Sequence, residues 1–150
     1  MKQFIDDIIS YIDTQFSNDD SLTKTLVGHY AYEKGLEPDA VTPFYTVQLL
    51  DNSTSLEDFD RETVISVPLQ INVYGVKMKV GGVLNDAQNV SLILAEKCIS
   101  FLEQFKYSTN KVISMRRITC SPALPYDDGS KAYYSAIRYN IQLKMPYVGA

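Results

Sequence analysis

The side chains that could do acid–base or nucleophilic chemistry are few and scattered in this sequence. The chain has one histidine, His29, in the weakly patterned segment VGHYAYEKG. A nucleophile needs a base and usually an orienting carboxylate beside it, but no GxSxG elbow is present and no spacing unites Ser, His and Asp. A lone histidine is more often a surface or hydrogen-bonded residue than a catalyst. We therefore expect no catalytic residue and no enzyme.

The acidic segment Asp51–Glu62, DNSTSLEDFDRE, is the one place where carboxylates gather around a conceivable cation. Aligned as a calcium-binding loop it fails, because Leu56 stands where glycine is needed and Phe59 where a ligand is expected. The glycines of GVKMKVGG match neither GxxxxGK[ST] nor GxGxxG. The sequence therefore predicts no metal and no cofactor.

Cysteine and arginine offer two further candidates. Cys98 and Cys120 have no CxxC spacing and no nearby histidine, so we expect buried free thiols. Arg116, Arg117 and Arg138 could form a basic patch on a sheet that binds RNA. Adjacent arginines in a strand face opposite sides, and interleaved aromatic residues are missing from the pattern. Ion pairs with carboxylates are the preferred interpretation.

The composition indicates one globular domain over residues 1–150. The chain is 45% hydrophobic and 21% charged, and a domain of this length buries roughly 70% of its unfolded surface. The net charge of -4 argues against retention of nucleic-acid phosphates. The N-terminus has no signal-peptide pattern and no apolar run is long enough for a membrane span, so neither is expected.

Hydrophobic spacing predicts the elements that would position any site. Helices are expected at Lys2–Phe16 and from a cap at Asn85, with Gln88 three residues on, to about Phe105. The stretch 17–43 is mostly connection, with a candidate strand at Leu26–Tyr32. The clear strands are Phe44–Leu50, Thr63–Tyr74, Lys111–Cys120 and Ala132–Met145.

These elements predict an α+β fold in the order α-β-β-α-β-β. An antiparallel or mixed sheet of about four strands should carry the helices on one face, because its last strand alternates apolar and polar residues. Pro68 lacks a backbone donor and favours an edge position or a bulge. The segment Asp51–Glu62 is expected to be a mobile polar hairpin tip.

Four segments in this order resemble the tail-terminator (head-to-tail joining, minor tail) family of siphophages. They are PFYTVQLLD, VPLQINVYG, NDAQNVSLILAEKCISFLEQF and MRRITCSPALPYDDGSKAYYSAIRYNIQLK, and together they cover roughly residues 42 to 146. The similarity lies in order and spacing: an extended segment, a variable loop, a strand ending in Val-Tyr-Gly, an amphipathic helix and a closing strand.

The resemblance implies a structural protein of the virion, assembled in the host cytoplasm and located at the head–tail junction. Such a protein forms a hexameric ring, stops growth of the tail tube and presents the tail to the head. Its partners would be its own copies, the tail tube protein and the head connector protein, with DNA only passing through the lumen and no membrane involved.

The expected contact residues lie in the hairpin tip and on the polar sheet face. Leu56 and Phe59 would be apolar anchors, Arg61 would pair with a partner's carboxylate, and Arg138 would support association. A solvated loop without a role is the alternative for the tip. For the whole chain the alternatives are a phage head-completion or connector protein and, in another class, a small-molecule-binding or RNA-binding α+β regulatory module.

Overall fold

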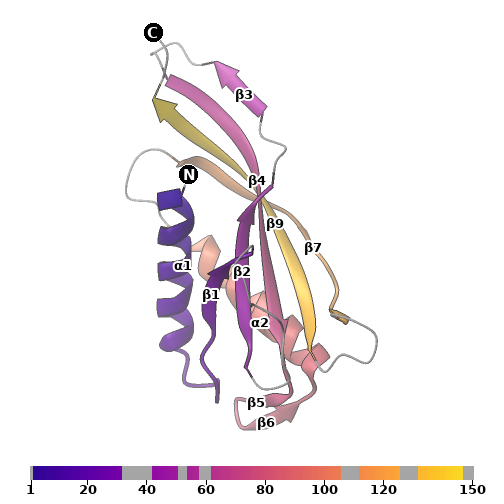
Figure 1. The fold of residues 1–150 in the computed structure, drawn as a ribbon. Coiled ribbons are helices and arrows are strands. Elements are labelled where there is room, and N and C mark those ends of the chain that lie inside the picture. The colour runs from indigo at the N-terminus through magenta and orange to yellow at the C-terminus, as the bar shows by residue number, and fades with distance from the viewer. Residues whose placement is uncertain are drawn as a thin grey trace.

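Two helices lie on one face of a mixed β-sheet, so the predicted α+β class is confirmed (Figure 1). The structure, a computed structural model, describes residues 2–31, 42–50, 54–57, 62–105, 112–125 and 132–146. The elements are α1 (Lys2–Ser17), β1 (Val27–Tyr30), β2 (Phe44–Leu49), β3 (Thr54–Glu57), β4 (Glu62–Gly75), β5 (Met78–Val80), β6 (Val83–Asn85), α2 (Ala87–Glu103), β7 (Val112–Cys120), β8 (Leu124–Pro125) and β9 (Tyr133–Pro146). The predicted order α-β-β-α-β-β is wrong, because it lacks the short strands β1, β3, β5, β6 and β8.

The main sheet has the strand order β1-β2-β4-β9-β7. β1 runs parallel to β2, and the other pairs are antiparallel. β4 and β9 pair over their whole length, from Glu62 opposite Pro146 to Gly75 opposite Tyr133. β3 adds to β4 and β8 to β9, while β5 and β6 form a separate hairpin. The long pairing of β4 with β9 therefore forms the centre of the sheet.

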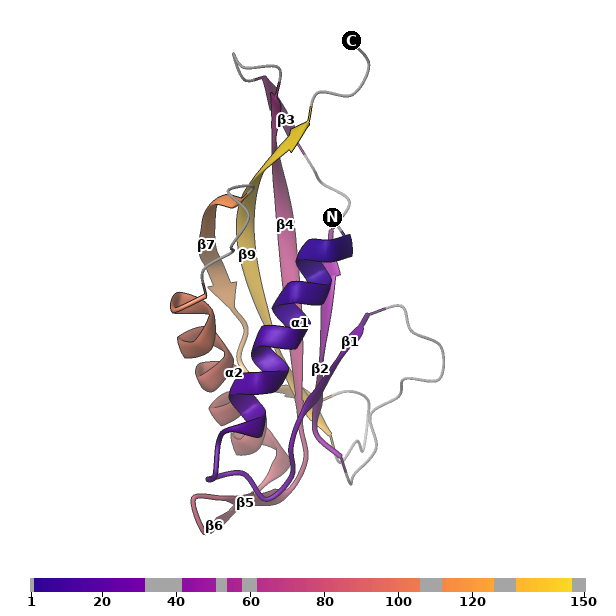
Figure 2. The same cartoon turned by 90° about the vertical axis from the view of Figure 1, so that its left-hand side faces the viewer.

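The core lies between the helices and the face of the sheet that they cover (Figure 2). The paired residues Ile71 and Ile137 are fully buried there, as the alternation in both strands predicts. The rest of the core repeats the predicted helical stripes, with Phe4, Ile8, Ile12 and Phe16 from α1 and Val90, Leu94, Cys98 and Leu102 from α2. Ile93, Ile99 and Phe105 are only partly buried.

The predicted cap of the second helix is wrong by one residue. Asp86 is the N-cap, and its carboxylate accepts a hydrogen bond from the Asn89 backbone N–H at 2.8 Å. Asn85 is instead the last residue of β6, paired with Met78. Asp and Asn cap helices equally well, so the strand pairing of Asn85 decides between them.

Gly75 sets how closely α2 approaches the central strands. A Cβ at this position would lie 2.4 Å from the Ser91 backbone N and 2.9 Å from the Ala87 carbonyl oxygen. Only glycine fits where two backbones meet at such a distance. The Tyr74-Gly75 corner of the sequence is therefore a packing contact between strand and helix.

Pro68 lies in a central strand, so the predicted edge position is wrong. Its carbonyl accepts a hydrogen bond from the Leu50 N–H at 2.8 Å, on the side of β4 that faces β2. The N atom of a strand residue points to the same side as its carbonyl. On that side β2 stops opposite Leu69 and β3 starts opposite Ser66. The missing donor of Pro68 thus falls between two partner strands.

The segment Asp51–Glu62 is not wholly a loop. Thr54–Glu57 forms β3 and pairs antiparallel with β4, from Thr54 opposite Ser66 to Glu57 opposite Thr63. β4 extends far enough beyond β2 to offer this stretch a free edge, and a polar sequence without apolar alternation gives no strand signal. The expectation of a loop is therefore wrong for Thr54–Glu57, and the mobility of the segment stays a prediction.

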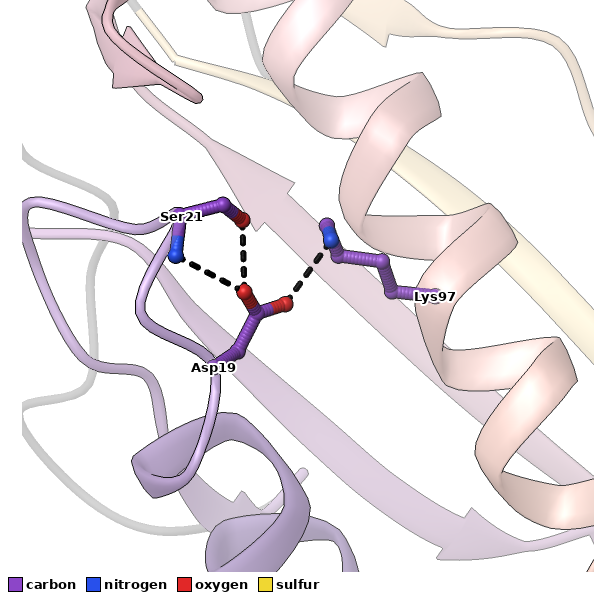
Figure 3. A network of polar contacts seen from close by, with 3 residues as sticks. All are labelled: Asp19, Ser21 and Lys97. Carbon is purple, nitrogen blue, oxygen red and sulfur yellow. Dashed lines mark hydrogen bonds and ion pairs between the residues drawn. The ribbon is translucent and has the colours of Figure 1, made fainter.

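A polar cluster joins the turn after α1 to α2 (Figure 3). Lys97 Nζ lies 2.8 Å from one carboxylate oxygen of Asp19, while the backbone N–H and hydroxyl of Ser21 donate to the other at 3.0 and 2.5 Å. Burial alone would raise the pKa of Asp19, but the hydrogen bonds from Lys97 and Ser21 outweigh it and lower that pKa. The cluster fixes the two helices relative to each other.

Candidate interaction surface

The face of the sheet opposite the helices carries a row of aromatic side chains. Strand register places Phe44, Tyr74 and Tyr134 side by side on β2, β4 and β9. The Phe44 and Tyr74 rings stack at 4.5 Å, and Tyr74 lies 5.5 Å from Tyr134. His29 of β1 meets the edge of the row, 6.2 Å from Phe44. The sequence argument that this sheet lacks interleaved aromatics is therefore wrong, because the row appears only when four strands are aligned.

Above this row the same face is polar and almost uncharged. The Arg138 guanidinium donates from Nε to Gln70 Oε1 at 2.9 Å, and the Gln70 amide donates to Asn72 Oδ1 at 2.9 Å. Farther along, the Ser66 hydroxyl donates to Asn140 Oδ1 at 2.8 Å. The first and third of these bonds join β4 to β9, and the second lies within β4; cross-strand pairs of this kind hold one another in place. The result is a surface of hydrogen-bonded amide and hydroxyl groups.

A hollow of about 350 Å³ opens on this face beside Arg138. Strands β7, β8 and β9 form its walls, and the lining residues are Gln70, Thr119, Cys120, Ser121, Leu124, Tyr134, Ala136 and Arg138. The Ser121 hydroxyl accepts a hydrogen bond from the Ala136 N–H at 2.8 Å, so it serves the backbone. Because the Ser121 hydroxyl is held by the backbone, the lining of the hollow suits a contact with a polypeptide better than a reaction.

The far ends of β4 and β9, together with β3, form an arm that extends past the helices. Both ribbon views show these strand ends beyond the N-terminus of α1 (Figures 1 and 2). The arm carries Leu56, whose backbone pairs with Val64. A small sheet needs a covered apolar face, or a helix packed on it, to be stable by itself, and neither helix reaches this end of the sheet (Figure 1). An extension of this kind is stabilised when something packs on it.

A hydrogen-bonded anchor joins α1 to the first two strands. Asp13 Oδ1 accepts from the Gly28 backbone N–H at 2.9 Å and from the Tyr45 hydroxyl at 2.6 Å, and Tyr30 donates to Asp6. Burial, and secondarily Asp13, raises the pKa of Tyr45. A groove of about 470 Å³ runs beside these residues. Because Asp13 is occupied by two internal donors, the anchor is structural.

The thiols do not form a nucleophilic pair. Cys98 is fully buried, and burial raises its pKa to about 12. Cys120 lies exposed at the end of edge strand β7, so the expectation that it is buried is wrong. Burial also raises the pKa of Cys120, whereas a nucleophilic thiol needs a lowered one.

The described residues provide neither a metal site nor a helix that could span a membrane. Among the described residues, no three side chains of the histidine, cysteine or carboxylate type come together in a way that would hold a metal ion. Neither α1 nor α2 has the length and apolar character that crossing a bilayer requires.

The predicted contact residues do not form one site. Arg138 is exposed on the open face beside Gln70, whereas Leu56 pairs with Val64. Gln70 and Val64 are six residues apart along β4, or about 20 Å at ~3.3 Å per residue. Phe59 and Arg61 lie outside the described residues. The arm and the open face are thus two separate surfaces.

Comparison with known proteins adds no relative to this description. No protein-family model and no curated protein sequence matches the chain.

Proposed function

We propose that this chain is a phage tail terminator, a structural protein without catalysis that forms a ring, caps the tail tube and joins it to the head. The order and spacing of its segments support this, since they resemble that family over most of the chain. The partners in this proposal are other copies of the chain, the tail tube protein and the head connector protein, at the head–tail junction of the virion.

The observation that carries the proposal is the arm. Strands β4 and β9 are each 14 residues long and stay paired to their ends, although the helices cover only part of that length (Figure 1). A bare strand edge is a site for pairing with another chain. A protein that works by self-association has a use for such an extension.

The open face suits the inner wall of a ring through which DNA moves without binding. Over Gln70–Tyr74 of β4 and Tyr134–Gln142 of β9, Arg138 is the one full charge on this face, and Gln70 accepts a hydrogen bond from it. The net charge of the chain is -4, and retention of DNA depends on many lysines and arginines that displace counterions. We propose that this face, or an equally neutral one, lines the lumen.

The RNA-binding module is the alternative that the aromatic row favours, and two observations weigh against it. Base-stacking platforms present free ring faces, but Phe44 and Tyr74 stack on each other and Phe44 is only 7% exposed. The net charge of -4 also gives no electrostatic attraction to the phosphates of RNA, on which such modules depend.

Loss of the gene tests the proposed role in the phage that encodes the chain. Without a terminator the tube is not capped, so we expect overlong tails and full heads that do not join. Electron micrographs of the lysate would show both. Tails of normal length beside full heads would instead indicate a head-completion protein, and normal virions would contradict both functions.

A further inference from the structure

One edge of the sheet, at β1, is closed by α1. The Ala31 N–H donates to Val47 O, so alternate residues of β1 face β2 and the N–H of Gly28 faces away from it. That outward N–H is taken by the Asp13 carboxylate at 2.9 Å. The same carboxylate holds Tyr45, which fixes it there. This edge is therefore poorly suited to adding another strand.

The opposite edge, at β7, is open. No strand in the described part of the chain pairs with the side of β7 that faces away from β9. β-bulges interrupt its register between Val112 and Ser114 and again between Arg117 and Thr119. Between them Ser114–Arg117 pairs regularly with β9. The edge thus offers one regular stretch of four residues, and this stretch contains both arginines of β7.

A strand of matching length lies at the other side of the molecule. β3 has four residues, pairs with β4 on one side, and has no described strand on the other. Its sequence, TSLE, has one acid and no base, whereas Val112–Cys120 has two arginines and no acid. The two free edges are therefore complementary in length and in charge.

The register shows that the two edges can meet in a closed assembly. Thr54 pairs with Ser66, Ser66 with Gln142 and Gln142 with Ser114, so one row crosses the sheet from β3 to β7. β3 runs antiparallel to β7, because each of the three intervening pairs is antiparallel. Counted from that row, Thr54–Glu57 of β3 extends toward one end of the sheet and Ser114–Arg117 of β7 toward the other. For the two stretches to pair side by side, neighbouring copies must be offset along the strands by about three residues, or ~10 Å. Strands tilted to a ring axis have a stagger of this kind.

We infer that β3 of one copy adds, antiparallel, to Ser114–Arg117 at the β7 edge of the next copy. This rests on the proposed ring. The contact is head-to-tail, since different surfaces meet, and repeated head-to-tail contacts generate a ring when the rotation closes. Main-chain hydrogen bonds supply the adhesion, as in other strand additions, and the opposite charges of the two strands favour this partner.

Disulfide trapping between two chains, each with one accessible cysteine, tests this contact. In a Cys120→Ser background, with buried Cys98 retained, one chain carries Ser55→Cys and the other carries a cysteine at Ser114, Met115, Arg116 or Arg117 in turn. Paired strands bring Cα atoms within the ~4.4–6.8 Å that a disulfide needs. We expect a crosslinked dimer in the mixture at one or two neighbouring positions and in neither chain alone. A chain with both cysteines should give a ladder that ends at the closed ring.

A cysteine at Val27, on the closed β1 edge and 53% exposed, is the matched control. Mixed with the β7 chain it should not crosslink. Thermal melts check that each variant folds, and Thr54→Cys or Glu57→Cys replaces Ser55→Cys if that chain melts early. Dimers from the β7 chain alone, or equal crosslinking of Val27→Cys, would overturn the inference, as would no mixed crosslink at any scanned position. Rings without the crosslink would refute this contact alone, whereas crosslinked rings that do not cap tails would refute the proposed function alone.

Discussion

Single residues hold the helices on the sheet through contacts that tolerate little change. Asp13 binds a backbone N–H and a tyrosine hydroxyl at once, and Gly75 lets α2 touch β4. Both residues act where a helix meets a strand end. Their substitution should therefore affect folding stability more than residue size alone suggests.

Tyr45→Phe should lower the free energy of unfolding by about 1 kcal/mol at pH 7, because Asp13 and the Ile9 carbonyl lose a buried donor. The folded state raises the pKa of Tyr45. Its contribution is therefore complete below the unfolded pKa of about 10 and is lost as the pH rises above it. Urea unfolding at pH 7 and at higher pH measures both effects.

Tyr139→Phe is the matched control for that change. Tyr139 is also buried, and burial raises its pKa, but its hydroxyl has no hydrogen-bond partner among the described residues. Removing an unpaired buried hydroxyl costs little and can stabilise. If both substitutions cost the same at pH 7, the anchor at Asp13 does not stabilise the fold.

Gly75→Ala should destabilise the protein by about 2–3 kcal/mol, because the new Cβ would lie 2.4 Å from a backbone atom that cannot move aside. Gly81→Ala serves for comparison: its positive φ of 61° is strained, but the space around it is open. That strain costs about 1 kcal/mol. Chemical denaturation compares the two, and equal losses would show that α2 shifts to make room.

At the scale of elements, the sheet separates a buried face from an open one. Ile71→Asp should unfold the protein, because Ile71 is fully buried between β4 and the helices and an unpaired buried carboxylate costs several kcal/mol. Arg138→Ala, on the opposite face and exposed, should fold normally and weaken association at most. Circular dichroism melts of the two variants test this, and an unchanged melting temperature for Ile71→Asp would contradict the assignment of faces.

The strongly periodic elements and the short strand β1 could be predicted from the sequence, whereas β3, β5, β6 and β8 could not. β2, β4, β9 and both helices fall within a few residues of their expected bounds, since each buries a stripe of apolar residues. β3 is a polar strand without apolar alternation that pairs with the next strand, β4, and the aromatic row of Phe44, Tyr74 and Tyr134 exists only through register. Neither leaves a local pattern.

At the scale of the whole molecule, a tail terminator and an RNA-binding module differ in what the open face should bind. We expect no measurable binding of fluorescent oligouridine at ~0.1 M salt, because the charge is -4 and the stacked rings are not free for bases. Fluorescence anisotropy measures this. Micromolar binding that disappears in a Tyr134→Ala variant would favour the RNA-binding module.

The ring on the tail tube is the central claim, and electron microscopy of tails mixed with the purified protein tests it most directly. The account predicts one closed ring at a single end of each tail, and rings of the same diameter in the free protein. A charge-reversed Arg116→Glu, Arg117→Glu variant with an unchanged melting temperature should leave those ends bare. Bare tail ends with the unaltered protein, together with a free protein that stays monomeric, would contradict the account.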